Sequence, residues 1–173
     1  MQENSYIIFI IDNDLNHANQ IQEHLSNHSH YNFYLFKSPD DCKQHMHLKP
    51  ALIFLDYELP PYKNNYAVVL EELKLLAPKA EVVLFTGVES VEIIKDSMHY
   101  GAYDFYIKGH HAHVKAEYLI IQILHKHQLK EEIQKQKKSI KLLLLIITAL
   151  ICTALIMYFS GFINDKYIGG NMF

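Results

Sequence analysis

Five short, continuous apolar runs divide the first 108 residues and limit the possible folds more than any other feature of the sequence. They are residues 6–11, 33–36, 51–55, 82–85 and 105–107. Runs of this length without polar alternation are typical of strands buried on both faces of a parallel sheet. Between and after them, apolar residues recur at helical spacing. These residues are Ala18, Ile21 and Leu25; Tyr66, Val69, Leu70 and Leu73; Val91, Ile94 and Met98; and Val114, Tyr118 and Ile121.

Turn and capping residues agree with this alternation. Ser38 followed by Pro39 is typical of an N-cap and a first helical position, Pro78 ends the third helix, and Gly101 suits the end of the fourth. The sequence therefore predicts an α/β fold in which a strand and a helix alternate five times. In such a fold the functional crevice lies at the carboxyl ends of the strands.

Polar residues follow the predicted strands at those ends. They are Asp12, Asn13 and Asp14 after the first strand, Asp56 after the third, Thr86 and Gly87 after the fourth, and Lys108 after the fifth. Paired carboxylates with few neutralising groups suit a hard divalent cation such as Mg²⁺. A lysine and a hydroxyl beside them suit a phosphoryl group. Together they favour phosphoryl transfer to a carboxylate.

Residues 5 to about 125 resemble the receiver domain of two-component response regulators. The resemblance rests on four motifs in order, IIFIIDND, LIFLDYELP, VVLFTG and YDFYIKG. It implies a doubly wound, flavodoxin-like sheet of five parallel strands in the order 2-1-3-4-5. It also implies a signalling switch rather than a turnover enzyme.

The resemblance assigns roles to individual residues. Asp56 would accept a phosphoryl group from a histidine kinase or a phosphotransfer protein. The ligands of Mg²⁺, or of another divalent cation, would be Asp12, Asp56 and the backbone carbonyl of Glu58, with Asn13 or Asp14 as a further candidate. The phosphoryl-binding and switch residues would be Thr86, Gly87, Lys108 and the aromatic Phe105.

Three departures from the family pattern leave an alternative open. Asn13 stands where the family usually has a second acid, which should weaken metal binding. Gly109 replaces the proline that commonly follows the lysine. We also expect no output domain beside the receiver. The alternative is a degenerate receiver that serves as a phosphorylation-independent membrane adaptor, and a phosphate sink is a third option.

Other functions lack support in the sequence. A phosphatase of the haloacid dehalogenase type needs a second Asp two residues after the first, where this chain has Glu58. The sequence contains neither GxxxxGK[ST] nor GxGxxG, so nucleotide binding is not indicated. All 16 basic residues are Lys and the net charge is −3, which argues against nucleic acid as a partner.

The second feature that limits the fold is an uncharged run of eighteen residues, 142–159, extended to 163 by further uncharged residues. At ~1.5 Å per residue this run matches a hydrocarbon core of ~30 Å. Four lysines lie just before it and one follows, namely Lys135, Lys137, Lys138, Lys141 and Lys166. The positive-inside rule then leaves the receiver in the cytoplasm, anchored by a single pass through the cytoplasmic membrane. The apolar run 6–11 is too short for a signal peptide.

The predicted organisation has four parts. Residues 1–125 form the receiver, 126–141 a helical stalk, 142–163 the transmembrane helix and 164–173 a short extracytoplasmic tail. A broken apolar stripe marks the stalk, and it comprises Leu124, Gln128, Leu129, Ile133, Gln136 and Ile140. This stripe has two equal interpretations. One is a weak coiled coil that makes a homodimer through the last receiver helix and stalk, and the other is a solvated stalk.

Histidines and cysteines carry less information. The spacings of His110, His111 and His113, with His125 and His127 further along, match no closed zinc site, so solvated surface histidines are favoured over a zinc site. Cys42 and Cys152 are the only cysteines. The second lies in the apolar run, so a reducing compartment without a structural disulfide is expected.

Overall fold

The computed structural model describes residues 5–25, 30–88, 90–109 and 112–168, and of residues 63, 64 and 161–168 it describes the backbone alone. By its internal contacts the chain divides into two units, Met1–His127 and Gln128–Phe173. The first unit holds the sheet and its helices, and the described residues of the second form the later part of one long helix.

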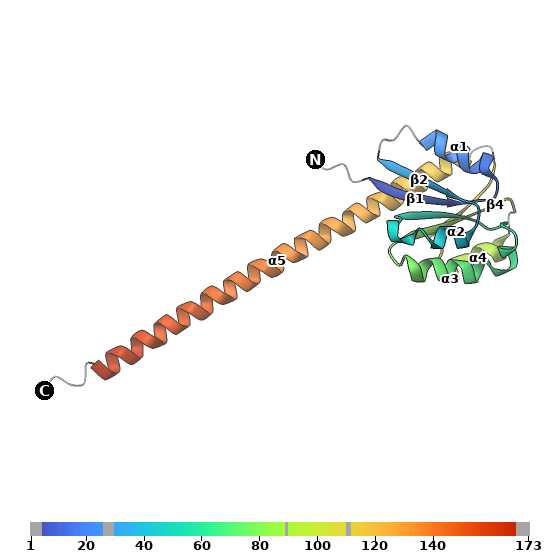
Figure 1. The fold of residues 1–173 in the computed structure, drawn as a ribbon. Helices are drawn as coiled ribbons and strands as arrows, with labels where there is room; N and C mark the ends of the chain where they lie inside the picture. Colours follow the sequence, from blue (N-terminus) through green and yellow to red (C-terminus); the bar gives the residue numbers. More distant parts are fainter. Residues whose placement is uncertain (1–4, 26–29, 89, 110–111, 169–173) are drawn as a thin grey trace. The chain divides into compact units, whose positions relative to one another are not determined.

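A five-stranded parallel sheet forms the centre of the first unit (Figure 1). Its strands are β1 (Tyr6–Ile11), β2 (Tyr31–Phe36), β3 (Leu52–Asp56), β4 (Glu81–Thr86) and β5 (Asp104–Ile107). Every neighbouring pair is parallel, and the order is β2-β1-β3-β4-β5. The predicted fold class, strand number and strand order are therefore confirmed.

Helices connect the strands. They are α1 (Leu15–Leu25), α2 (Pro39–Lys43), α3 (Tyr66–Leu76), α4 (Val91–His99) and α5 (Ala112–Ile168), with short 3₁₀ turns η1 (Met46–Leu48) and η2 (Tyr62–Asn65). The predicted caps are present. Ser38 Oγ accepts the backbone N–H of Asp41 at 3.2 Å, which satisfies one of the free donors at the start of α2. Gly101 follows α4 with φ of 96°, a conformation that favours glycine.

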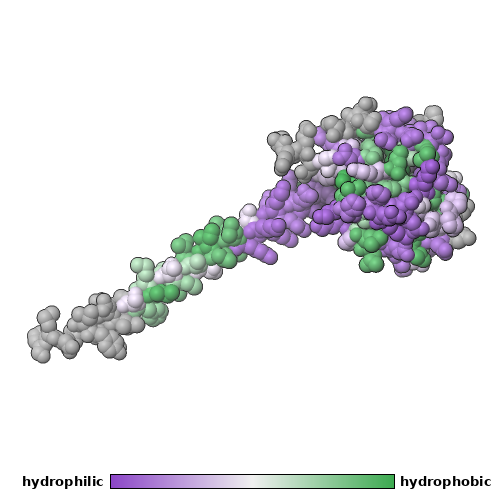
Figure 2. Space-filling view, in the orientation of Figure 1, coloured by the Kyte–Doolittle hydropathy of each residue, from purple (hydrophilic) through white to green (hydrophobic). Residues whose placement is uncertain are grey.

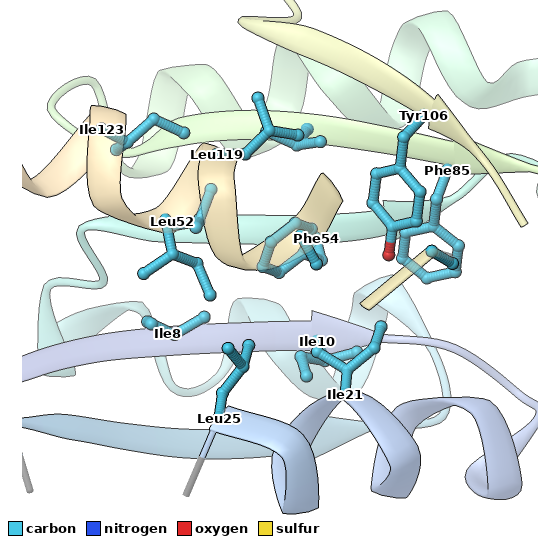
Figure 3. Close-up of a cluster of buried hydrophobic side chains, with 14 of the residues drawn as sticks. Ile8, Ile10, Ile21, Leu25, Leu52, Phe54, Phe85, Tyr106, Leu119 and Ile123 are labelled. Atoms are coloured by element: carbon cyan, nitrogen blue, oxygen red, sulfur yellow. The ribbon is translucent and has the colours of Figure 1, made fainter. Parts of the chain in front are cut away.

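Each face of the sheet carries its own hydrophobic core. On one face, alternate strand residues such as Ile8 and Phe54 pack with α1 and with the first turns of α5, through residues such as Ile21 and Leu119 (Figure 3). On the other face the intervening residues pack with α2 and α3. Because β1, β3 and β4 are buried on both faces, their sequences are continuous apolar runs rather than alternating ones.

The apolar residues that predicted the last two helices are not the ones that the domain buries. In α4 both Val91 and Met98 are exposed, and in α5 the exposed residues include Val114, Tyr118 and Ile121. The core face of α5 instead comprises Ala112, Ala116, Leu119, Ile120, Ile123 and Leu124. Both helices carry apolar residues on two faces, so helical spacing alone could not identify the inner one.

The second unit is helical up to Ile168, which is five residues beyond the predicted membrane span. Within the described residues, α5 is the one helix that is long and apolar enough to cross a membrane. Its hydrophobic segment is green in Figure 2 and is preceded by a hydrophilic one, shown in purple. From Leu142 to Phe159 its large apolar side chains are exposed. The predicted boundaries of stalk, span and tail stay predictions.

Candidate functional site

The polar residues predicted to meet at the carboxyl ends of the strands do so around Lys108. Asp56 is the last residue of β3, whereas Asp12 and Lys108 directly follow β1 and β5. Lys108 Nζ lies 2.9 Å from Asp56 Oδ2 and 3.8 Å from Asp12 Oδ2. Its ammonium also lies 4.9 Å from the centre of the Phe85 ring, a further favourable contact for a cation. One lysine therefore bridges both carboxylates.

Asp56 is almost fully buried, and both of its oxygens have partners. Oδ1 accepts the backbone N–H of Glu58 at 3.0 Å, and Oδ2 faces Lys108. Burial raises the pKa of this carboxyl above its ordinary value, against the opposing effects of Lys108 and the N–H of Glu58. Asp56 is thus a carboxylate whose negative charge is only partly compensated in the folded chain.

Asp12 is completely buried and is compensated more fully. Burial alone would raise its pKa, but hydrogen bonds from His17 and from the backbone N–H of Asp14, with the charge of Lys108, outweigh that effect and lower it. The distances are 2.7 Å from His17 Nδ1 to Oδ2 and 2.8 Å from the N–H of Asp14 to Oδ1. Since the ionised carboxylate can only accept, His17 Nδ1 carries the shared proton.

His17 is the residue of this site that the sequence analysis missed. It lies in the first turns of α1, and its ring stacks at a tilt on Phe85, with 5.1 Å between ring centres. Its Nε2 is buried and has no hydrogen-bond partner among the residues that the structure describes. A histidine five positions after Asp12, near the start of the next helix, is the signal that could have drawn attention to it.

The candidate metal ligands differ in how far they are exposed to solvent. Asn13 and Asp14 are both exposed, and Asp14 Oδ1 accepts the N–H of Asn16 at 3.0 Å at the start of α1, so Asp14 serves as a helix cap. Among the described residues no three His, Cys, Asp or Glu side chains form a group that could hold a metal ion. Mg²⁺ binds with one or two carboxylates and retains several waters, so the carboxylates of Asp12 and Asp56 still fit the needs of this ion.

The predicted phosphoryl-binding residues Thr86 and Gly87 lie at the end of β4, the strand next to β3. Thr86 ends β4, and its hydroxyl bonds locally, accepting the N–H of Val88 at 3.0 Å and donating to the Val88 carbonyl at 3.3 Å. The N–H of Gly87 donates to Glu58 Oε2 at 2.9 Å. A Cβ at Gly87 would lie 2.7 Å from the same oxygen, so this position allows the close approach of Glu58.

Phe105, the predicted switch aromatic, is partly buried and packs on the core face that α2 and α3 cover. Its neighbour Tyr106 lies on the opposite face, where its ring stacks on Phe85 with 5.6 Å between centres. The Phe85 ring therefore contacts both the Tyr106 ring and the ammonium of Lys108.

The structure describes only part of the histidine cluster noted in the sequence. His110 and His111 lie outside the described residues. The ring of His113 lies 4.3 Å from that of His24 on α1, and the Nε2 of His24 lies 3.6 Å from Glu117 Oε2. His125 is exposed, and His127 is partly buried.

Comparison with solved structures finds receiver domains. The signal receiver domain of a putative LuxO repressor from Vibrio parahaemolyticus matches with a TM-score of 0.65 and 19% identity, over 75% of this chain and 97% of that one. A response regulator from Thermotoga maritima matches at 0.63 and 14%, over 70% and 98%. NtrX from Brucella abortus matches at 0.66 and 22%, over 78% of this chain and 29% of that one.

These likenesses show that residues of the first unit have the fold of response-regulator receiver domains. No family model matches the sequence, and no curated protein does.

Proposed function

We propose that this chain is a membrane-anchored signalling switch that accepts a phosphoryl group on Asp56. The observation that carries the proposal is the contact of Lys108 Nζ with Asp56 Oδ2 at 2.9 Å, beside the buried carboxylate of Asp12 and at the carboxyl edge of a receiver-like sheet. A buried, incompletely compensated carboxylate beside a cationic side chain is suited to act as a nucleophile toward phosphorus.

The proposed reaction transfers a phosphoryl group between proteins. A carboxylate oxygen of Asp56 attacks the phosphorus of a phosphohistidine on a histidine kinase or phosphotransfer protein. The new P–O bond forms as the P–N bond breaks, and the histidine leaves with the electron pair. Lys108 then pairs with the phosphoryl oxygens. Asp12, Asp56 and the Glu58 carbonyl would hold a divalent cation, which supplies neutralising charge when bound.

Thr86 would convert the modification into a change of shape. Its hydroxyl bonds to Val88 at the start of the β4–α4 connection. A phosphoryl oxygen on Asp56 competes for the same O–H, so phosphorylation would release Val88 and bias α4 and the exposed side of β5 and α5. We propose that this surface contacts the downstream partner protein.

The proposed membrane anchor is the hydrophobic part of α5. Its polar side chains satisfy themselves within the helix, as a lipid environment requires: Thr148 Oγ1 donates to the Leu145 carbonyl and Thr153 Oγ1 to the Leu150 carbonyl, each at 2.8 Å. The lysines before this segment support a receiver on the cytoplasmic side. Alkaline carbonate should therefore leave the full chain in the membrane fraction and release a fragment that ends at residue 133.

The experiment for the phosphoacceptor uses that same fragment, residues 1–133. It is incubated with acetyl phosphate and Mg²⁺ and weighed intact beside its Asp56→Asn variant. One added phosphoryl group on the wild type alone supports the proposal. Equal masses for both proteins at high Mg²⁺ contradict it.

A phosphorylation-independent adaptor is the second candidate function, and a specific observation favours it. Asn13 is exposed, Asp14 caps α1, and the Asp12 carboxylate already has His17 and Lys108 as partners within the chain. A site so compensated can exist without a metal ion. An Asp56→Asn chain that retains full biological function would support the adaptor.

A further inference from the structure

Within the first unit, the long helix α5 exposes an apolar stripe. Val114, Tyr118 and Ile121 are each 52–53% exposed, although their spacing of four and three residues puts them on one side of the helix. The buried residues of the same turns, such as Ala116, Leu119 and Ile123, lie on the opposite side. In the described part of the chain this stripe therefore remains uncovered by the receiver core.

The same helical spacing continues in the second unit. Leu129, Ile133 and Ile140 are 46%, 50% and 57% exposed, and Gln136 completes a spacing of four, three and four residues. Such a spacing places Ile133 and Ile140 at a positions and Leu129 and Gln136 at d positions of a heptad repeat. Between Ile121 and Leu129 the exposed His125 gives two successive spacings of four residues. One extra spacing of four in a heptad pattern is called a stutter.

We propose that the stalk of α5 pairs in parallel with the stalk of a second copy of this chain, along the seam Leu129, Ile133, Gln136 and Ile140. The proposal rests on the proposed function only for the membrane anchor, which holds two copies in the same direction. The apolar stripe alone does not identify its partner, and the proposal names that partner as a second copy of this chain.

Charge favours a parallel copy over an antiparallel one. With Ile133 at an a position, Glu132 occupies g and Lys137 the following e, and these two positions face each other across a parallel dimer. Each dimer would contain two such Glu132–Lys137 pairs. In an antiparallel dimer e faces e, which would bring Lys130 against Lys137, two like charges.

The width of the stripe argues against a membrane surface as the occupant. A helix that lies on a membrane presents a broad apolar face, whereas this stripe has two positions per heptad. Lys130, Glu132, Lys137 and Lys138 lie on both sides of it. A narrow seam with flanking charges is typical of a helix that packs against another helix.

The experiment uses disulfide crosslinking of the full chain in membranes. In a Cys152→Ala background, single Ile133→Cys and Ile140→Cys variants are treated with a mild oxidant and run on a non-reducing gel. Lys138→Cys is the matched control, because it lies at an f position outside the seam. Both a-position variants should form covalent dimers at least about fivefold more than the control, since a positions face each other in a parallel pair.

A charge exchange tests the orientation. Glu132→Lys should lower the crosslinking of Ile133→Cys about threefold, since it turns two exposed pairs of opposite charge into pairs of like charge. Adding Lys137→Glu to Glu132→Lys should restore it. A control that crosslinks as strongly as the seam variants, or an absence of dimer at every position, would overturn the proposal.

The two proposals fail separately. Crosslinking is measured on the full chain without a phosphoryl donor, and phosphorylation is measured on residues 1–133 with acetyl phosphate. Crosslinked dimers together with no gain of mass from acetyl phosphate support pairing and refute the switch. Phosphorylation of Asp56 without crosslinking supports the switch and refutes pairing.

Discussion

His17 Nδ1 lies 2.7 Å from Asp12 Oδ2, which ties the start of α1 to the carboxylate that the metal site would use. The same oxygen lies 3.8 Å from Lys108 Nζ. A divalent cation that binds Asp12 must therefore compete with two donors of this chain.

Replacing His17 should tighten the binding of Mg²⁺. His17→Leu removes the donor to Asp12 while it keeps an apolar side chain against Phe85. Because a hydrogen bond to a charged group contributes about 1.5–3 kcal/mol, the expected change is about tenfold or more. Isothermal titration calorimetry on residues 1–133 measures it, with His24→Leu on the same helix as control. Weaker binding by His17→Leu would mean that His17 positions Asp12 for the metal.

Asp56→Asn should stabilise the metal-free fragment at neutral pH. The folded chain raises the pKa of Asp56, mainly by burial, so the ionised form costs stability above that pKa and the protonated form does not. Asparagine removes the charge, and the expected gain at pH 7 is about 0.5–2 kcal/mol, as for other functional sites under strain. The gain should shrink as the pH falls through the pKa of Asp56, where the wild-type carboxyl is also neutral.

Urea unfolding of the two proteins at pH 7 and at pH 4 measures that difference. Asp14→Asn is the matched control, because Asp14 is exposed and asparagine caps a helix equally well. Destabilisation by Asp56→Asn at pH 7 would show that the contact with Lys108 outweighs the cost of burial.

Gly101→Ala should destabilise the first unit by about 1–2 kcal/mol, the cost of a left-handed backbone in a residue with a Cβ. Gly101 has φ of 96°, and an added Cβ would meet Lys74 Cγ at an ordinary 3.8 Å, so the cost comes from the backbone. Thermal unfolding measures it. Gly109→Ala is the control, because a Cβ there meets nothing within 4 Å. Equal midpoints for both variants would contradict the positive φ.

Cys42 should resist alkylation in the folded fragment. It is fully buried, and burial raises the pKa of its thiol to about 12, so the reactive thiolate is scarce at pH 8. Residues 1–133 contain no other cysteine, so intact mass after iodoacetamide treatment reports on Cys42 alone. Addition of the reagent should require urea. Labelling of the native fragment as fast as of the unfolded one would show that the packing of α2 against the core does not protect this residue.

The strands were predictable because burial on both faces leaves a direct mark in the sequence. The predicted runs coincide with β1 and lie within one or two residues of the other four strands. The largest difference is at β2, which begins at Tyr31 rather than at residue 33. This edge strand alternates in burial, so Asn32 is exposed at its start and interrupts the apolar run.

The sequence predicted which residues meet at the candidate site but did not predict their hydrogen-bond partners. Parallel topology brings Asp12, Asp56, Thr86 and Lys108 to one edge whatever their side chains do. Which donors they use depends on local loop geometry instead. Thr86 bonds to Val88, and His17 bonds to Asp12. Both hydrogen bonds depend on the shapes of short connections, which the periodicity of apolar residues does not encode.

The sparse burial of α4 has a consequence for local stability. Of its nine residues, all of which the structure describes, Ser97 is the buried one. A helix held by so few apolar contacts opens at lower free energy than the core strands do. Backbone amides of α4 should therefore exchange with solvent through local openings that leave β3 and β4 intact. In that sense the helix next to Thr86 is the part of the domain that a single new oxygen ligand could most readily rearrange.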